Sequence, residues 1–172
     1  MEPLKTYDYL VLARARVLGW ARPLTAEQHL KQFPIGLGSL ARTLTHVMGS
    51  EWFYMQRMQQ LPVPPYEQWA IKDENPPVFA VIEAEWTRQA ERTRAALAAV
   101  KDWSEQIEYR TLPHPGEPIN IITATRGDIF TQFVLHEVHH RAQAMNMLRH
   151  LGVAVSDIDY NTLMYRRRHA EA

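Results

Sequence analysis

Residues 125–152 read TRGDIFTQFVLHEVHHRAQAMNMLRHLG, and this stretch decides the fold class of the chain. Thr125 and Asp128 stand three residues apart, as in a capping box, and Gly152 suits the position just after a helix. Between these ends, apolar residues recur at intervals of three and four. The residues of this stripe are Ile129, Phe133, Ala144, Met147 and Leu151. The stretch therefore predicts a long amphipathic helix whose stripe faces a helical core.

Two histidines share that stripe. His136 and His140 are four residues apart, so their side chains lie almost above one another on the predicted helix. Two imidazoles placed in this way can direct nitrogen atoms at one metal ion, at about 2.0–2.1 Å. A metal would also satisfy two polar rings that point into an apolar interior. The alternative is a pair of hydrogen-bonded core residues, because this spacing also arises by chance in a histidine-rich chain.

Three further segments have helical periodicity, at residues 4–20, 37–61 and 76–101. Prolines end the second segment, and we expect Pro76 and Pro77 in the first turn of the third. Before the fourth helix, β-prone runs at residues 107–110 and 119–122 flank a Pro/Gly turn at 113–116 and predict a small hairpin. Together these segments predict an all-α four-helix bundle with a β-hairpin between its third and fourth helices.

The composition indicates one globular domain, residues 1–172. Hydrophobic residues make up 46% of the chain, and 19 basic and 19 acidic residues give a formal net charge of zero. We therefore expect neither nucleic acid nor a membrane as a partner. The absence of cysteine excludes disulfides, thiolate metal ligands and a cysteine nucleophile. The opening residues lack a signal-peptide layout, and no apolar run is long enough to span a membrane, so we expect a cytoplasmic protein.

A metal held by two histidines needs at least one more ligand, from another helix. Of the other histidines, only His46 lies in the body of a different predicted helix. It falls more than about 90° from the stripe that contains Leu40, Leu44 and Glu51, so periodicity leaves its orientation undecided. His139 lies about 100° round the fourth helix from the stripe centre, and we expect it to flank the site.

Two groups of residues leave alternatives open. Glu51 is a carboxylate within an otherwise apolar stripe, so it either acts near the metal, or extends its carboxylate to solvent or pairs with an arginine such as Arg141. The aromatic side chains of several tryptophans either line a pocket or belong to the core. These tryptophans are Trp52, Trp69, Trp86 and Trp103.

Several strings in the second and fourth predicted helices form a recognisable set. They are Gly38-Ser39-Leu40, Leu44-Thr45-His46 and Glu51, then Leu135-His136-Glu137-Val138-His139-His140-Arg141-Ala142-Gln143, with Leu148-Arg149-His150-Leu151-Gly152 and Asp157-Ile158-Asp159-Tyr160 after them. With these strings the chain resembles the DinB-like (YfiT-like) superfamily of metalloenzymes over essentially its whole length. The resemblance implies an up-down-down-up bundle whose metal ligands are His46, His136 and His140. One departure is Ala142, where the family usually has glycine, which concerns the packing of that turn and not the ligands.

The resemblance also implies a class of function. Family members of known activity include thiol-dependent transferases and isomerases, so we expect a metal-dependent enzyme that acts on a small-molecule substrate. Three histidines leave open positions on a divalent ion, which we expect to be zinc or nickel, with iron or manganese also compatible. Because the chain has no cysteine, the thiol would be a low-molecular-weight cosubstrate, bound to the metal as a thiolate. We also expect a homodimer.

Glu137, Glu51, Tyr54 and Gln143 are the candidates for a direct catalytic or orienting role. The letters from His136 to His140 also spell HExxH, the zinc metalloprotease motif, in which Glu137 would be the general base. No third ligand follows at the spacing such proteases use, which argues against that function. The alternatives to a transferase are a metal-dependent hydrolase and a non-catalytic bundle that binds a metal or another ligand.

Overall fold

The computed structural model describes residues 2–112, 116, 118–166 and 168. In this part the chain is mostly helical, with one two-stranded antiparallel sheet. The elements in chain order are α1 Pro3–Ala21, α2 Ala26–Leu30, α3 Leu40–Met58, the 3-10 turn η1 Tyr66–Gln68, α4 Phe79–Ala99, β1 Gln106–Arg110, β2 Ile121–Thr125, α5 Arg126–His150 and α6 Tyr160–Met164. The long helices and the hairpin occur where the sequence predicts them, whereas the short helical elements were not predicted.

α5 begins and ends as its sequence predicts. The hydroxyl of Thr125 accepts a hydrogen bond from the Asp128 backbone at 3.0 Å, and the Asp128 carboxylate accepts one from the Thr125 backbone at 2.9 Å. These two bonds complete the capping box. Beyond the last turn, Gly152 has φ +81°, in the left-handed region that glycine adopts without strain.

Two helix boundaries differ from the prediction. α3 begins at Leu40 and not at residue 37, because Gly36 and Gly38 have φ of +47° and +88°, which no helix accommodates. The expectation that Pro76 and Pro77 lie in the first turn of α4 is wrong. Val78, in an extended conformation, is the residue that precedes the helix, so both prolines lie outside it.

The hairpin is displaced by a few residues from its expected position. β2 spans Ile121–Thr125 and not 119–122, because it pairs with β1 as far as Gln106 opposite Thr125. The predicted turn at 113–116 lies largely outside the described residues. Since β2 leads directly into α5, the hairpin fixes where that helix begins.

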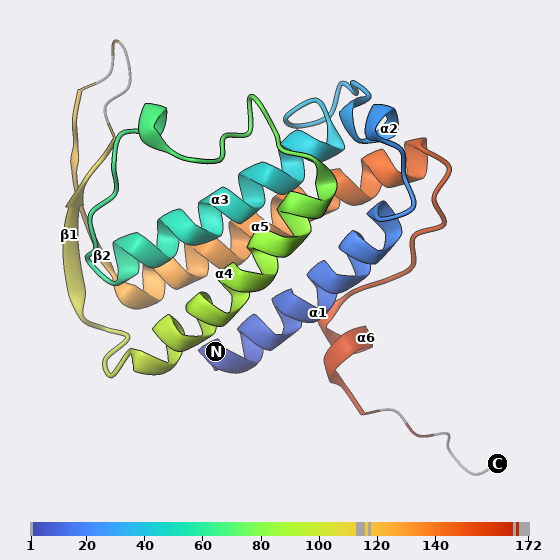
Figure 1. Ribbon diagram of the computed structural model, residues 1–172. Coiled ribbons are helices and arrows are strands. Elements are labelled where there is room, and N and C mark those ends of the chain that lie inside the picture. The colour runs from blue at the N-terminus through green and yellow to red at the C-terminus, as the bar shows by residue number, and fades with distance from the viewer. Residues whose placement is uncertain (1, 113–115, 117, 167, 169–172) are drawn as a thin grey trace.

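The long helices pack side by side around a common core. α3 packs along α4 and α5, and α1 packs along the same two helices (Figure 1). Each contributes fully buried apolar side chains, such as Leu10, Leu40, Ile82 and Phe133. In the part of the chain that the structure describes, no helix combines the length and the apolar character needed to cross a membrane.

The connection between α3 and α4, residues 59–78, is called here the crossover segment. It contains η1 and passes along α3, where it appears in green in Figure 1. Trp69 of this segment packs edge-on against Trp52 of α3, with ring centroids 4.9 Å apart. Asp73 of the same segment lies 3.1 Å from His46 Nδ1, so the crossover segment also covers the side of α3 that carries His46.

Candidate metal centre

Three histidines from two helices meet at one place. His46 projects from α3, and His136 and His140 project from successive turns of α5. Ring nitrogens of the three residues all lie within 4.8 Å of one another. The structure thus brings together the two histidines that periodicity predicts and the third that the family resemblance implies.

The spacing of His46 and His136 fits a shared divalent ion. The Nε2 atoms of His46 and His136 are 3.1 Å apart. Two nitrogen ligands about 2.0–2.1 Å from one ion stand roughly 2.9–3.4 Å from each other at tetrahedral to octahedral angles. Because two nitrogen lone pairs at this separation repel unless a cation or a proton lies between them, the pair is suited to holding a metal.

His46 is oriented by a carboxylate that sequence reasoning missed. Its Nδ1 lies 3.1 Å from the Asp73 carboxylate, which belongs to the crossover segment. An N–H at Nδ1 directed to Asp73 leaves the Nε2 lone pair free for a metal. The hydrogen bond from His46 lowers the pKa of Asp73 to about 2, so this carboxylate is ionised at neutral pH. No periodicity marks a residue in a connection, and Asp73 left no signal in the sequence.

Asp73 has a second partner within the crossover segment. The Tyr66 hydroxyl lies 2.5 Å from the other carboxylate oxygen of Asp73 and 2.6 Å from the carboxylate of Glu74. Burial and these two neighbouring carboxylates raise the pKa of Tyr66, which stays protonated as a donor. The segment is therefore linked to His46, a candidate ligand on α3, through a carboxylate that its own residues hold in place.

Gln143 orients the His140 ring in the same way. Its side-chain oxygen lies 2.9 Å from His140 Nδ1, and its nitrogen lies 2.9 Å from Nε2 of the exposed His139. Gln143 thus connects His140, a candidate ligand, to His139, which flanks the group as expected. Gly36 packs behind them: a Cβ atom at this position would lie 2.2 Å from the Gln143 oxygen. Ala142, the departure from the family pattern, is exposed, so its methyl group crowds no neighbour.

The electrostatic surroundings keep two of the imidazoles neutral. Burial, assisted by the neighbouring histidines, lowers the pKa of His136 to about 3. Burial likewise lowers the pKa of His140. Since a metal binds the neutral imidazole, both rings are in the form that coordination requires at pH 7.

The two candidate acids, Glu51 and Glu137, lie in a buried ionic cluster with Arg14 of α1. Glu51 accepts from Tyr7 at 2.6 Å, from Arg14 at 2.6 Å and from Trp86 at 2.7 Å. The expected buried ion pair of Glu51 with an arginine is present, but its partner is Arg14, which is 5% exposed, and not the suggested Arg141. Helical spacing places Arg14 on the apolar stripe of α1 with Leu10 and Val17, but it could not name the partners of Arg14, which come from other helices.

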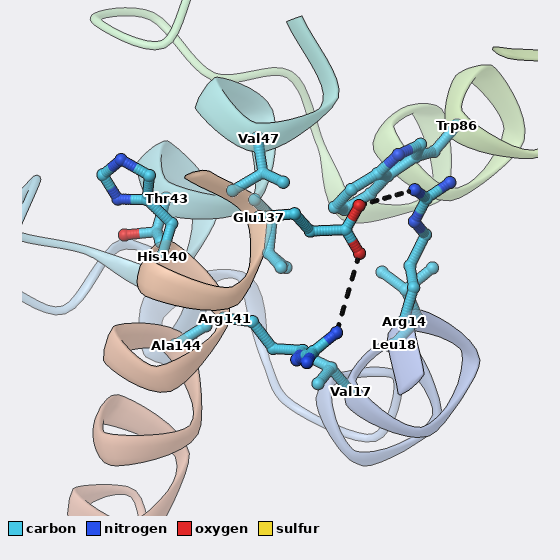
Figure 2. Close-up of a pocket in the computed structure, with 11 residues that line it drawn as sticks. Arg14, Val17, Leu18, Thr43, Val47, Trp86, Glu137, His140, Arg141 and Ala144 are labelled. Atoms are coloured by element: carbon cyan, nitrogen blue, oxygen red, sulfur yellow. Dashed lines mark hydrogen bonds and ion pairs between the residues drawn. The ribbon is translucent and has the colours of Figure 1, made fainter. Parts of the chain in front are cut away.

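Glu137 faces the same cluster. Its carboxylate accepts from Arg14 at 3.0 Å and lies 3.9 Å from Arg141, as Figure 2 shows. Burial raises the pKa of Glu137. Both carboxylates also hold Arg14 charged, since they raise its pKa although burial opposes this. With 2% of its side chain exposed, Glu137 is enclosed by protein, and this geometry does not favour its use as the base of an HExxH protease.

A cleft of about 310 Å³ adjoins the histidines. Its wall includes His46, His136, Tyr54 and Asp73, together with several aromatic and apolar side chains. The Tyr54 ring lies 5.6 Å from that of His136, and its hydroxyl accepts a bond from Gln132 at 3.3 Å. Of the four candidate catalytic residues, Tyr54 is therefore the one that lines this cleft.

The four tryptophans divide between the two expected roles. Trp69 lines this cleft, and Trp52 and Trp69 line a neighbouring cavity of about 350 Å³. Trp86 belongs to the buried Arg14 cluster, and Trp103 packs edge-on against Phe130, with ring centroids 5.4 Å apart. Of these four tryptophans, Trp52 and Trp69 are the ones placed to contact a ligand in these two cavities.

Comparison with known proteins agrees with the geometry of the site. No curated protein was found to be similar to this chain. The sequence model of the DinB family, in contrast, matches residues 1–170, which includes all three histidines and both helices that carry them. The chain belongs to the DinB family.

Proposed function

We propose that the protein is a metal-dependent enzyme whose divalent ion is held by His46, His136 and His140. The observation that carries the proposal is the convergence of these three imidazoles beside a cleft large enough for a small molecule, whose wall includes His46 and His136. Three protein ligands leave coordination positions for a substrate. When bound, the ion would act as a Lewis acid and lower the pKa of a water molecule or a thiol that it binds.

We further propose thiol-dependent transfer as the reaction. Membership of the DinB family supports a metal-dependent enzyme, and the absence of cysteine means that a low-molecular-weight thiol would supply the sulfur. The cleft wall contains Phe53, Tyr54, Tyr66 and Trp69, whose rings would hold an apolar substrate and exclude water from it. Tyr54 can donate its hydroxyl hydrogen to a substrate atom in this cleft, a role that Glu51 and Glu137 are too enclosed to share.

The metal we propose is zinc or nickel, ahead of iron or manganese. Imidazole ligands suit all four ions, and affinity for such sites increases toward the end of the first transition series. His46 and His140 would hold the ion through Nε2, because Asp73 and Gln143 take up their Nδ1 atoms.

Elemental analysis of protein purified without a histidine tag tests the site. The wild type should retain close to one equivalent of a divalent metal, and a His136→Ala/His140→Ala variant should lose it. A His139→Ala variant is the matched control, because His139 lies on the same helix but contacts Gln143 and not the centre. Equal, substoichiometric metal in all three proteins would contradict the proposal.

A second experiment tests the reaction class. Zinc- and nickel-loaded proteins are incubated with low-molecular-weight thiols and an electrophile such as 1-chloro-2,4-dinitrobenzene, and thioether formation is followed by absorbance. Conjugation should require both thiol and metal and should fall at least tenfold in His136→Ala/His140→Ala. Metal-dependent loss of an ester probe without any thiol requirement would indicate a hydrolase in place of a transferase.

We also propose the up-down-down-up order for the four long helices, together with a cytoplasmic homodimer. The length of the crossover segment supports this order, because two neighbouring parallel helices need a connection that returns along the bundle. Light scattering coupled to size-exclusion chromatography tests the dimer, and an experimental structure tests the helix order.

A further inference from the structure

The two helices that carry the histidines are joined at a second place, away from the histidines. On α3, Glu51 lies five residues after His46, and on α5, Glu137 directly follows His136. The Nη2 atom of Arg14 donates to Glu51 Oε2 at 2.6 Å and to Glu137 Oε2 at 3.0 Å. A single nitrogen atom of α1 therefore bridges both ligand-bearing helices.

Arg14 and Glu51 are themselves held firmly. The Arg14 guanidinium carbon lies 4.4 Å from the centroid of the Trp86 ring on α4, and the Trp86 indole donates to the same Glu51 oxygen as Arg14 at 2.7 Å. The Tyr7 hydroxyl donates to the other Glu51 oxygen at 2.6 Å. Because α1 and α4 both contact this pair, the bridge has little freedom to shift.

The bridge and the ligands lie on different faces of α5. In Figure 2, Glu137 points from α5 toward Arg14, while the His140 ring points away from Arg14. Rotating a helix by about 10° moves atoms at its side-chain radius of roughly 5–6 Å by about 1 Å. This exceeds the roughly 0.5 Å within which a functional group must be held. Fixing Glu137 therefore also fixes the histidines on the same rigid helix.

We infer that Arg14 is a positioning residue for the metal centre. By bridging Glu51 and Glu137 it sets the rotation of α3 and α5 about their own axes, and with it the convergence of His46 on His136 and His140. This inference rests on the proposed metal site. It also gives the two buried glutamates a role that requires no contact with substrate.

The test compares zinc affinity in three full-length proteins, stripped of metal and titrated in competition with a chromophoric chelator. Arg14→Met removes the bridge and should weaken zinc binding by about ten- to hundredfold, as loss of an outer partner of a ligand does. It should also change the visible absorption spectrum of the cobalt(II)-loaded protein. Arg14→Lys, which keeps the charge, should recover part of the affinity. Arg22→Met is the matched control and should bind zinc like the wild type, because it breaks an ion pair with Glu83 in which no member of the bridge takes part.

Arg14→Met leaves two buried carboxylates without a counter-charge and can fail to fold. A second variant, Arg14→Met/Glu51→Gln/Glu137→Gln, removes the bridge together with both charges and should fold while showing the same weakened zinc binding. Urea unfolding of the metal-free proteins measures stability separately. Unchanged zinc affinity and an unchanged cobalt spectrum in a folded variant, even with a lower urea midpoint, would show a purely structural role and overturn the inference. Failure of the wild type to bind zinc would overturn the proposed function itself.

Discussion

At the scale of single residues, Asp73 has the clearest expected effect. Asp73→Asn keeps the shape of the side chain but removes the negative charge that holds the His46 Nδ1 proton. We expect zinc affinity to fall by about ten- to hundredfold, because a metal ligand is oriented by its outer partner. Chelator competition on the stripped protein measures this.

Glu74→Gln is the control for that change. The carboxylates of Glu74 and Asp73 both lie within hydrogen-bond distance of the Tyr66 hydroxyl. Of these two carboxylates, it is Asp73 that contacts His46. Its replacement should leave zinc affinity within about twofold of the wild type. Equal losses in the two variants would indicate that the crossover segment as a whole, and not the Asp73 carboxylate, supports His46.

His29 provides a residue-scale prediction that concerns stability. It is 5% exposed, stacks on Phe79 with ring centroids 4.7 Å apart, and has its pKa lowered by burial. Below about pH 6.5 the unfolded chain binds a proton at His29 more readily than the folded protein does. The free energy of unfolding therefore has its full contribution from His29 above that pH and loses it as the pH falls toward the lowered pKa of the folded state. One such histidine lowers the free energy of unfolding by up to about 1.4 kcal/mol for each pH unit within this range.

Urea unfolding between pH 7 and pH 5, in the presence of a chelator, measures this dependence. His29→Phe should retain the stacked ring and reduce the loss of stability on acidification. Phe79→Leu, which alters the same contact but keeps the imidazole, should retain the steeper dependence. An identical slope in the wild type and His29→Phe would show that other groups cause the acid sensitivity.

At the scale of elements, the turn before α3 supports a ligand on α5. Gly36 has φ +47°, and a Cβ atom there would lie 2.2 Å from the Gln143 oxygen that orients His140. Gly36→Ala should therefore displace Gln143 as well as strain the backbone, at roughly 1–2 kcal/mol for the left-handed conformation. We expect lower stability together with weaker zinc binding, measured by urea unfolding and chelator competition.

Gly152→Ala separates the two effects of that substitution. Gly152 has φ +81°, and a Cβ atom there would meet nothing within 4 Å. This variant should lose a similar amount of stability and keep its zinc affinity. If Gly36→Ala also keeps its affinity, Gln143 does not orient His140 in the way proposed.

At the scale of the whole molecule, metal binding should stabilise the fold. The centre joins α3 to α5, so it exists only when the two helices are packed, and an ion that binds only the folded state stabilises it by about 2.7 kcal/mol at one hundred times its Kd. For a chain of this size that corresponds to a rise in Tm of about 5–10 °C. Thermal unfolding followed by circular dichroism, with and without zinc, measures the shift.

A His46→Ala/His136→Ala/His140→Ala variant is the reference for this shift. Without the three ligands its Tm should not respond to zinc, while its Tm in chelator should stay near that of the stripped wild type. An equal response to zinc in both proteins would mean that the ion stabilises the fold from somewhere else.

The sequence by itself determined the long helices, the hairpin and the shared face of His136 and His140. Caps and apolar spacing act between residues three or four apart, so the chain carries them without reference to its fold. The capping box of Thr125 is the clearest example. Helix ends were less certain, since extended or left-handed residues such as Val78 and Gly38 decided them.

Only the tertiary structure decided the rest of the site. The ring of His46 faces α5 because α3 and α5 pack together, a contact that periodicity along α3 alone could not predict. Asp73, Gly36 and Arg14 each support the centre from segments distant in the chain, and Arg14 in place of Arg141 pairs with Glu51. Such pairs depend on how whole helices are placed against one another, and no local spacing encodes that placement.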